Sequence, residues 1–567
     1  MQQKDLESAA KLRGGYYTPE KISDFLIEWG FNLEDSPKNI LEPSCGDGQF
    51  LHSLYRYSSN SKSSNSKIQF LGVELNEVEF NKSKKIFNKL KKDFNYTGKI
   101  KNSDFFQYMR NTNDRIAKKK FDLILGNPPY IRYQYFDQGK EVAEVNFEEL
   151  GIKTTKHANS WLYFLGDCVS RMSDDSRIGM VIPAELLHIT YAKGLRKWLL
   201  EELDNTVLIT FQELVFPNVQ QEVVLFLGEK KSSSTTKKLK MVQKKNLESL
   251  SSDIWDEVNE KAPIVLDDND KWNCYFLEKS ELDFCRKSFS KKDIVEFNDV
   301  ADIKIGIVTG ANKFFCVNDE KLNDLHLSKG PNKGLNVLKV MGRSWDVKGI
   351  EFTKKDYLTN CKLAKSTNLL YFNPDFSRSK LSTQIASYLN EGEEVNLHER
   401  YKCRIRKPWY WIPYVESSNI SMFKRASEYS RLILNSAETY TTDTVHRISM
   451  RDGNNYSSMD MCFSFINSLT FLSCELEGRN YGGGVLELVP GEIRKLKVPM
   501  YNCSKDEFNH LDSLFRQNKD IDTILDYTDE ILLSSLSKRD RKKIRKCWRK
   551  LQNRRSVRGK SKRLISR

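Results

Sequence analysis

Between residues 39 and 228, short apolar runs alternate with longer segments in which apolar residues recur at helical spacing. The short runs are typical of strands, and the longer segments between them are typical of helices. A regular alternation of strands and helices favours a doubly wound, mostly parallel sheet. Ligands in such a sheet bind beyond the carboxyl ends of the strands, so the residues that follow each strand are the first candidates for a site.

The pattern predicts a strand in NILE (39–42) and further strands at 68–76, 121–127 and 178–187, followed by two late strands in NTVLITFQELVF and QEVVLFLGE. It predicts helices at 78–94, 160–172 and 191–203.

The pattern changes after a Lys/Ser/Thr-rich stretch at 229–240, where short strand-like pieces, turn glycines and aromatic residues become frequent. We therefore predict an α/β domain at 1–240, a mixed α+β domain at 241–500, and a helical segment with a basic tail at 501–567. The tail carries the excess charge of the chain. Residues 538–567 hold 16 Lys/Arg and one Asp, which equals the net +15 of all 567 residues. Such a tail either binds phosphates without sequence preference or is simply solvated.

The 11 cysteines are scattered and include no CxxC pair, which argues against a structural zinc site or a disulfide framework. We expect no metal. No apolar run approaches the roughly 20 residues that a membrane-spanning helix needs. The first residues lack the apolar core of a signal peptide, so we expect a cytoplasmic protein.

Three acid-bearing turns follow the early strands in chain order. The first, EPSCGDG (42–48), joins Glu42 to a helix through glycines, which allow close approach to a ligand. Glu74 ends the next strand, where a carboxylate can accept hydrogen bonds from ribose hydroxyls. Asp104 follows and is adjacent to Phe105. The carboxylate can accept a hydrogen bond from an exocyclic amine, and the aromatic ring can stack on a purine. Together the three turns indicate a nucleoside-binding site.

The fourth turn, GNPPY (126–130), follows a buried strand. Asn127 offers a side-chain carbonyl, and the two prolines fix the backbone and leave no N–H donors. Tyr130 adds a flat stacking surface. This turn is suited to accept two hydrogen bonds from a planar amino group while holding its ring. By itself it is compatible with adenine, cytosine or a glutamine amide.

In this order, GGYYTPEKISDFL, LEPSCGDGQFL, GVELN, SDFF, GNPPY, ANSWLYFL, MVIPAELL and LVFPNVQQEVVLFL resemble the gamma-class (TaqI-like) N6-adenine DNA methyltransferases of restriction–modification systems. The resemblance covers roughly residues 14–228. It implies a Rossmann-like S-adenosyl-L-methionine (SAM) methyltransferase domain, followed by a target-recognition domain. It also implies site-specific methyl transfer to the N6 amino group of an adenine flipped out of double-stranded DNA.

The same resemblance implies roles for individual residues. Asn127 and the Pro128 carbonyl should bind the target amino group, Tyr130 should stack on the flipped base, and Phe216 should pack against that base. The cofactor should contact Thr18, Glu42, Ser44, Gly46, Glu74, Asp104, Phe105 and Pro129.

Two stretches of the second domain are candidates for DNA binding. RIRKPWYWIP interleaves Arg404, Arg406 and Lys407 with aromatic residues, which equally suits a core cluster with solvated charges. GRNYGGG contains Arg479 and Tyr481 in a glycine-rich loop, which is compatible with a DNA contact or with a structural loop.

Three alternatives to a self-sufficient DNA methyltransferase remain open. The chain could be a modification subunit that needs a separate specificity subunit, an RNA or protein-glutamine methyltransferase, or a DNA-binding module without catalysis. The long second domain and the intact GNPPY turn favour the enzyme. No nuclease motif is evident, so we expect the cognate restriction endonuclease, where one exists, to be a separate chain. We also expect the protein to be a monomer.

Overall fold

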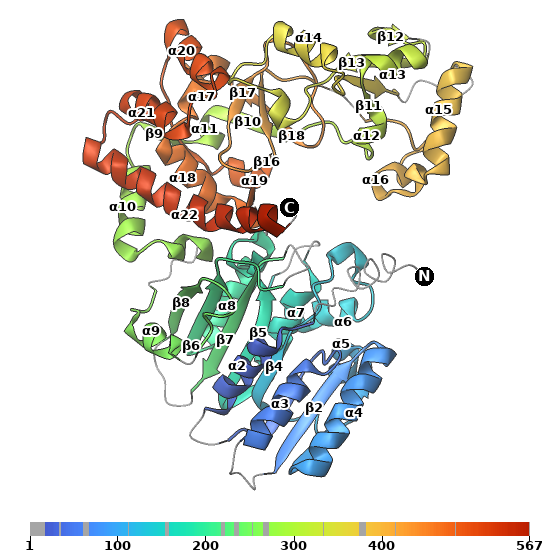
Figure 1. Cartoon of the computed structure of the whole chain (residues 1–567), viewed down its shortest axis with the longest axis vertical. Coiled ribbons are helices and arrows are strands. Elements are labelled where there is room, and N and C mark those ends of the chain that lie inside the picture. Colours follow the sequence, from blue (N-terminus) through green and yellow to red (C-terminus); the bar gives the residue numbers. More distant parts are fainter. Residues whose placement is uncertain are drawn as a thin grey trace. The chain divides into compact units, whose positions relative to one another are not determined.

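The computed structural model describes residues 17–565, except 33–35, 61–66, 112, 154–157, 217–220, 232–236, 252, 265–270, 333, 374–380, 414–415 and 482. The side chains of Tyr481 and of residues 557–565 also lie outside the description. The chain divides into two compact units (Figure 1). Unit 1 holds residues 1–279 with 481–484 and 557–567, and unit 2 holds 280–480 and 485–556.

Unit 1 is built on one eight-stranded sheet in the order β3-β2-β1-β4-β5-β7-β6-β8. The first five strands in that order run parallel, β7 is antiparallel to both of its neighbours, and β8 is parallel to β6. The strands are β1 (Asn39–Glu42), β2 (Ile68–Glu74), β3 (Tyr96–Asn102), β4 (Phe121–Gly126), β5 (Met172–Pro183), β6 (Asn205–Phe211), β7 (Val223–Lys230) and β8 (Lys238–Lys244).

Helices join these strands and cover the sheet (Figure 1). They are α2 (Glu20–Phe31), α3 (Gln49–Asn60), α4 (Glu77–Asp93), α5 (Phe105–Asn111), α6 (Lys140–Glu149), α7 (Ser160–Ser170), α8 (Lys193–Glu202) and α9 (Ile254–Glu260). The predicted doubly wound, mostly parallel sheet is confirmed. The sequence did not predict strand β3, and the expected domain boundary after residue 240 falls inside β8, which completes the sheet of unit 1.

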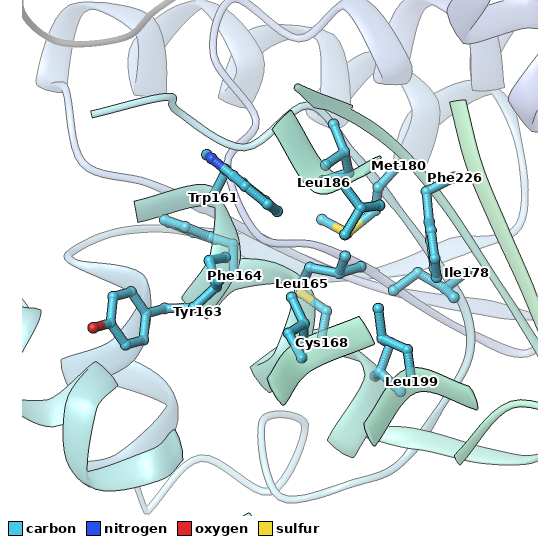
Figure 2. Close-up of a cluster of buried hydrophobic side chains, with 14 of the residues drawn as sticks. Trp161, Tyr163, Phe164, Leu165, Cys168, Ile178, Met180, Leu186, Leu199 and Phe226 are labelled. Atoms are coloured by element: carbon cyan, nitrogen blue, oxygen red, sulfur yellow. The ribbon is translucent and has the colours of Figure 1, made fainter. Parts of the chain in front are cut away.

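The helix α7 is buried along nearly its whole length, from Ser160 to Val169. Its apolar residues pack with strand β5 and helix α8 in one of the two large cores of unit 1 (Figure 2). Trp161 and Leu165 are fully buried in this core. Because burying side chains of this size contributes about 1.5–3 kcal/mol each, the start of α7 is a rigid support for whatever contacts it.

Among its described residues, unit 2 contains four smaller sheets together with helices, in agreement with the expected α+β composition. One joins β10 (Ala301–Ile305), β18 (Val445–Met450), β15 (Ile420–Phe423) and β17 (Leu432–Leu434), and a second joins β11 (Cys316–Val317), β14 (Asn368–Tyr371), β13 (Leu335–Lys339) and β12 (Gly330–Asn332). The others are β16 (Arg425–Ala426), β20 (Val485–Glu487) and β19 (Arg479–Tyr481), and the pair β21 (Lys497–Pro499) and β9 (Ile294–Glu296). The longer helices of the unit are α10 (Lys279–Phe289), α14 (Lys354–Lys362), α15 (Thr383–Glu394), α17 (Ser458–Ser464), α18 (Ser468–Glu477), α20 (Lys505–Arg516), α21 (Ile521–Leu532) and α22 (Lys538–Ile565).

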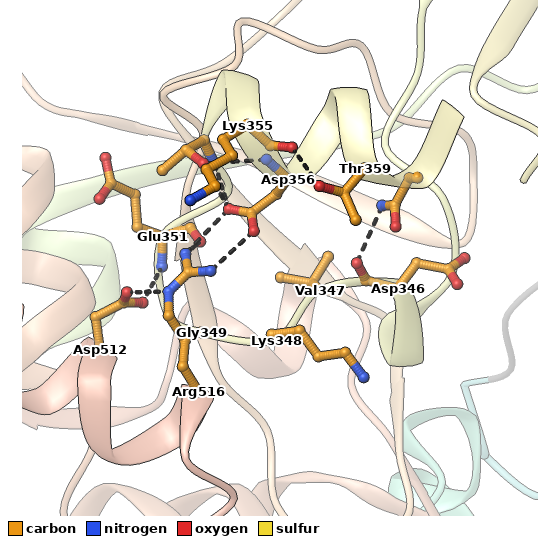
Figure 3. Close-up of polar contacts among 12 residues, drawn as sticks. Asp346, Val347, Lys348, Gly349, Glu351, Lys355, Asp356, Thr359, Asp512 and Arg516 are labelled. Atoms are coloured by element: carbon orange, nitrogen blue, oxygen red, sulfur yellow. Dashed lines mark hydrogen bonds and ion pairs between the residues drawn. The ribbon is translucent and has the colours of Figure 1, made fainter. Parts of the chain in front are cut away.

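The helical segment after residue 500 is joined to the rest of unit 2 by a charged network (Figure 3). Arg516 of α20 pairs with Asp356 of α14 at 2.8 Å and with Asp512 at 2.5 Å. Asp512 also accepts the backbone N–H groups of Ile350 and Glu351. The contacts therefore place α20 within unit 2 and not in a separate domain.

Candidate functional site: the carboxyl edge of the unit 1 sheet

In the sheet of unit 1, the strand order switches direction between the neighbouring strands β1 and β4. Strands β1 to β4 are parallel, so their carboxyl ends lie along one edge of the sheet. The turns predicted to form a site follow these ends at Glu42, Glu74, Asn102 and Gly126. This is the position at which doubly wound sheets bind ligands.

The Gly-rich turn after β1 is tied to the end of β2. The N–H of Gly46 donates to Oε2 of Glu74 at 2.8 Å, and the N–H of Asn76 donates to Oε1 of the same carboxylate at 2.7 Å. Gly46 has φ +52° and open space where a Cβ would stand, whereas a Cβ on Gly48 would meet the Ser83 backbone at 3.2 Å. The first glycine leaves room for a ligand, and the second allows α4 to pack closely.

Glu42 ends β1 with its carboxylate buried. Both carboxylate oxygens lack a hydrogen-bond partner within the described residues. Burial raises the pKa of Glu42 well above its usual range. The Cys45 thiol lowers that pKa in part, and the nearby carboxylates of Glu74 and Asp47 raise it by smaller amounts. A buried carboxyl without a partner is costly, and an arriving cation or hydrogen-bond donor would relieve that cost.

Asp104 and Phe105 follow β3. Asp104 accepts the backbone N–H of Gln107 at 2.9 Å, and burial raises its pKa. A Cβ added to Gly139 would meet the Asp104 carboxylate at 2.3 Å, so the chain lies directly against it there. The ring of Phe105 is buried and stacks on Phe164 with centroids 5.2 Å apart.

The GNPPY turn positions the Asn127 amide from two sides. Its Nδ2 donates to Oγ1 of Thr18 at 3.1 Å, and its Oδ1 accepts from the Tyr130 hydroxyl at 2.8 Å. That hydroxyl also lies 2.9 Å from the backbone carbonyl of Val181 on β5. Thr18, predicted to contact the cofactor, therefore also meets the catalytic candidate directly.

The backbone carbonyls of the turn differ in their partners. The Asn127 carbonyl accepts from the Ser44 hydroxyl at 3.2 Å, and the Pro129 carbonyl accepts from the Ser160 hydroxyl. The Pro128 carbonyl between them has no hydrogen-bond partner in the part of the chain that the structure describes. The Pro128 carbonyl is therefore the acceptor of this turn that stays available, and the two prolines fix its direction.

Sequence reasoning did not identify Ser160 as a site residue, although it lies in the ANSWLYFL segment. Besides holding the Pro129 carbonyl, its hydroxyl accepts the N–H of Ile131 at 2.9 Å. The signal was available, because a small hydroxyl residue at the start of a buried apolar helix often bonds to backbone.

Tyr130 and Phe216 share one apolar cluster. Phe216 is buried in the second large core of unit 1, and the half-buried ring of Tyr130 packs against that same core. Both aromatic residues predicted to hold the target base therefore lie in one region, although residues 217–220 of the LVFPNVQQ motif lie outside the described chain.

In unit 2 the RIRKPWYWIP stretch separates into buried and exposed parts. Arg406 donates to the backbone carbonyls of Thr309, Trp411 and Val308 at 3.0, 3.0 and 2.5 Å, and burial lowers its pKa. Arg404 and Lys407 are exposed. The guanidinium of Arg406 thus stabilises the loop. The hydrophobic residues Trp409, Tyr410 and Ile412 beside it belong to a core cluster.

In GRNYGGG, the second candidate stretch for DNA binding, the arginine also pairs within the protein. Nε of Arg479 on β19 donates to Oε1 of the buried Glu492 at 2.7 Å, which holds the start of the strand. The side chain of Tyr481 lies outside the described part, so that prediction stays open.

Within the described residues, no group of three or more His, Cys, Asp or Glu side chains could hold a metal ion. None of the described helices combines the length and the apolar character that crossing a bilayer demands.

The sheet order, the antiparallel β7 and the turns at the β1/β4 switch define a Rossmann-like methyltransferase domain. Residues 3–304, more than half of the chain, match the family model of the N-6 DNA methylases, and the chain belongs to this family. It is a DNA methyltransferase, and the resemblance expected from the sequence is confirmed. Residues 269–533 match the model of the C-terminal domain of Type II methyltransferase M.Eco57I.

Among named relatives, the chain is similar to Type II methyltransferase M.AccI of Acinetobacter calcoaceticus, with 25% identity over 92% of this chain and 94% of the relative. It is also similar to Type II methyltransferase M.HincII of Haemophilus influenzae, with 21% identity over 79% of this chain and 78% of the relative.

Two solved structures share the fold at low identity. The ATP-dependent Type ISP enzyme LlaBIII bound to DNA aligns with a TM-score of 0.51 and 14% identity, over 92% of this chain and 41% of that one. The DrdV–DNA complex aligns with a TM-score of 0.50 and 12% identity, over 90% of this chain and 57% of that one.

Proposed function

We propose that the protein transfers a methyl group from SAM to the N6 amino group of an adenine flipped out of double-stranded DNA, at a specific sequence. The observation that carries this proposal is the pair of acceptors in the GNPPY turn. The Asn127 amide is held in place, and the Pro128 carbonyl is rigid and accepts no hydrogen bond from any described residue. An exocyclic amino group has two hydrogens, and this pair offers one acceptor for each.

These acceptors also account for the chemistry. The lone pair of an adenine N6 is delocalised into its ring, which makes the nitrogen a poor nucleophile. Hydrogen bonds from both N6 hydrogens to Asn127 Oδ1 and the Pro128 carbonyl draw the nitrogen toward tetrahedral geometry and localise the pair. To accept from N6, Asn127 Oδ1 must share or release the Tyr130 hydroxyl, for which the Val181 carbonyl provides an alternative acceptor. Positioning and fixed dipoles are then the main catalytic effects.

The residues of the carboxyl edge fit the cofactor. SAM bound there would supply a methyl group already activated on a sulfonium. The buried carboxyl of Glu42, which has no hydrogen-bond partner among the described residues, suits the α-ammonium of its methionine part, beside Ser44, Gly46 and Thr18. Glu74 suits the ribose hydroxyls and Asp104 the adenine amine, with Phe105 and Pro129 along the cofactor.

Base flipping has a cost of a few kcal/mol, and stacking on an aromatic ring offsets about 1–3 kcal/mol of it. Tyr130 and Phe216 are the rings we assign to the flipped base. In unit 2 we assign Arg404 and Lys407 to DNA contacts, since both side chains are exposed. Arg406 and Arg479 are assigned to holding their loops, and Tyr481 remains a candidate contact.

The names of the relatives M.AccI and M.HincII support a role as the modification enzyme of a restriction–modification system. In this role the protein acts in the cytoplasm as a monomer, and a cognate restriction endonuclease would be a separate chain. The match to M.AccI over nearly the whole of both chains favours a self-sufficient enzyme over a subunit that depends on a separate specificity subunit.

The test is the Asn127→Ala variant in a tritium-transfer assay with purified protein, labelled SAM and duplex DNA. Loss of one acceptor that acts on the reacting group should lower kcat by at least about 100-fold, by analogy with removal of a single oxyanion-hole donor. SAM affinity by calorimetry should change little, because the cofactor contacts assigned above lie on other residues.

An Asn88→Ala variant is the matched control, because Asn88 is an exposed residue of α4. It should match the wild-type protein in turnover and thermal stability. Turnover retained in Asn127→Ala would refute the proposed role of the amide. Methyl transfer to RNA or protein instead of duplex DNA would refute the substrate.

A further inference from the structure

The basic C-terminal helix α22 has one strongly buried face. Ile544, Cys547, Trp548 and Leu551 are all buried, and the ring of Trp548 lies 5.3 Å from that of Phe471 on α18. Cys547 and Trp548 lie three and four residues after Ile544, and four and three residues before Leu551, so all four lie on one side of the helix. Packing therefore fixes which side of α22 faces the solvent.

Ion pairs fix the same orientation. The guanidinium of Arg555 and the carboxylate of Glu475 form a 2.8 Å pair in which both side chains are almost completely buried. Arg545 pairs with Asp529 at 2.8 Å, and Lys550 pairs with Glu281 at 2.7 Å. These three cations of the helix are thus neutralised within unit 2.

The opposite face keeps its charge. Lys538, Arg539, Lys542 and Lys546 are exposed, and none of them has an ion pair with a described residue. Residues 538, 542 and 546 lie four apart, so they align on one face, with Arg539 beside them. At 1.5 Å per residue the four span about 12 Å of helix. We call these four residues the α22 stripe.

We propose that the α22 stripe binds the phosphate backbone of duplex DNA and adds affinity without sequence preference. The inference rests on the proposed function, since it takes DNA to be the substrate. A polyanion is the partner that an aligned row of uncompensated cations fits, and duplex DNA has one negative charge per about 1.7 Å of its axis. The rigid attachment of α22 to unit 2 means that DNA can bind the stripe without first ordering it.

The stripe should determine how strongly DNA binding depends on salt. Each phosphate neutralised by a cation contributes about −0.9 to the slope of log K against log [salt] on B-DNA. The variant that tests this replaces four cations by glutamine: Lys538→Gln, Arg539→Gln, Lys542→Gln and Lys546→Gln. Its slope for a fluorescent duplex without the target sequence, measured by anisotropy across a KCl series, should be shallower by about 3–4.

A second four-charge variant is the control, because it removes the same charge from exposed positions of α4: Lys84→Gln, Lys85→Gln, Lys89→Gln and Lys92→Gln. It should keep the wild-type slope. Melting curves show whether both variants remain folded. Methyl transfer by the stripe variant should keep its recognition sequence and its kcat at saturating DNA, with a raised KM for DNA.

An unchanged slope in the folded stripe variant would overturn the proposal. So would a variant that keeps its DNA slope but loses binding to anionic phosphatidylglycerol vesicles, since the stripe would then be a membrane surface. Because the duplex has no target sequence and the assay needs no turnover, a shallower slope supports the stripe even where the wild-type protein fails to methylate adenine.

Discussion

Glu42 of unit 1 has a buried carboxylate with no hydrogen-bond partner among the described residues. Its pKa is raised in the folded chain because burial disfavours the charged form. Its protonated form is compatible with folding, so its stabilising contribution is fullest below the ordinary glutamate pKa. That contribution is lost as the pH rises toward the raised value. A cationic ligand bound beside this carboxyl would stabilise its ionised form, and that interaction would add to the affinity for the ligand.

We therefore predict that SAM binding releases a proton from Glu42. Between the ordinary and the raised pKa the free protein holds this carboxyl protonated, and an α-ammonium beside it would favour ionisation. Calorimetric titrations in two buffers of different ionisation enthalpy give the number of protons released. We expect up to one in the wild-type protein and none in Glu42→Gln, which should also bind SAM more weakly.

Glu148→Gln provides the control, because Glu148 is an exposed residue of α6. Equal proton release in the wild-type protein and in Glu42→Gln would show that another group receives the cofactor's charge.

Site residues that directly follow strands were easier to predict from the sequence than residues in the loops of unit 2. Asn127, Thr18 and Ser44 were all predicted, and the structure joins them by hydrogen bonds. The place of Asn127 and Ser44 at the edge of a parallel sheet follows from strand order, whereas Thr18, which precedes α2, was expected from the family resemblance. By contrast, Arg406 resembled a DNA-reading arginine, yet its donors go to backbone carbonyls more than 90 residues earlier and five residues later. No local pattern reveals partners at such distances.

Among the elements, α22 differs most from its sequence prediction. The 16 Lys/Arg among residues 538–567 were compatible with a simply solvated tail, but Ile544, Cys547, Trp548 and Leu551 are buried on one side of the helix. The apolar residues are few, so the charges conceal their helical spacing. Strand β3 went unpredicted for a similar reason, because its sequence YTGKIKN is polar and it lies at the edge of the sheet.

The Arg555–Glu475 pair gives a prediction for this element. Removing one partner of a buried pair leaves an uncompensated charge, which typically costs about 3–5 kcal/mol. We expect Glu475→Gln to lower the stability of unit 2 by an amount of this order. Hydrogen–deuterium exchange should show faster exchange in α18 and α22, and calorimetry should show a lower unfolding temperature.

The exposed Glu530 of α21 supplies the matched change, Glu530→Gln, which should leave both measurements unaltered. A difference of less than about 1 kcal/mol between the two variants would contradict a stabilising role for the pair, since that is the size expected of an exposed one.

For the whole molecule, the sequence predicted the architecture of unit 1 more fully than that of unit 2. Unit 1 is a repeated alternation of strand and helix whose order follows general rules of sheet connection. Unit 2 joins strands far apart in the chain, such as β10 with β18 and β9 with β21. Such pairings depend on long-range packing, so only its mixed composition was predictable.

The proposed function of the whole molecule is site-specific methylation of adenine N6 in DNA. Its most direct test is methylation-sensitive long-read sequencing of DNA from cells that lack other adenine methyltransferases and express either the wild-type protein or Asn127→Ala. We expect N6-methyladenine at one consistent sequence motif with the wild-type protein and none with the variant. Folded, SAM-binding wild-type protein that leaves no adenine mark, or a mark that persists in Asn127→Ala, would contradict it.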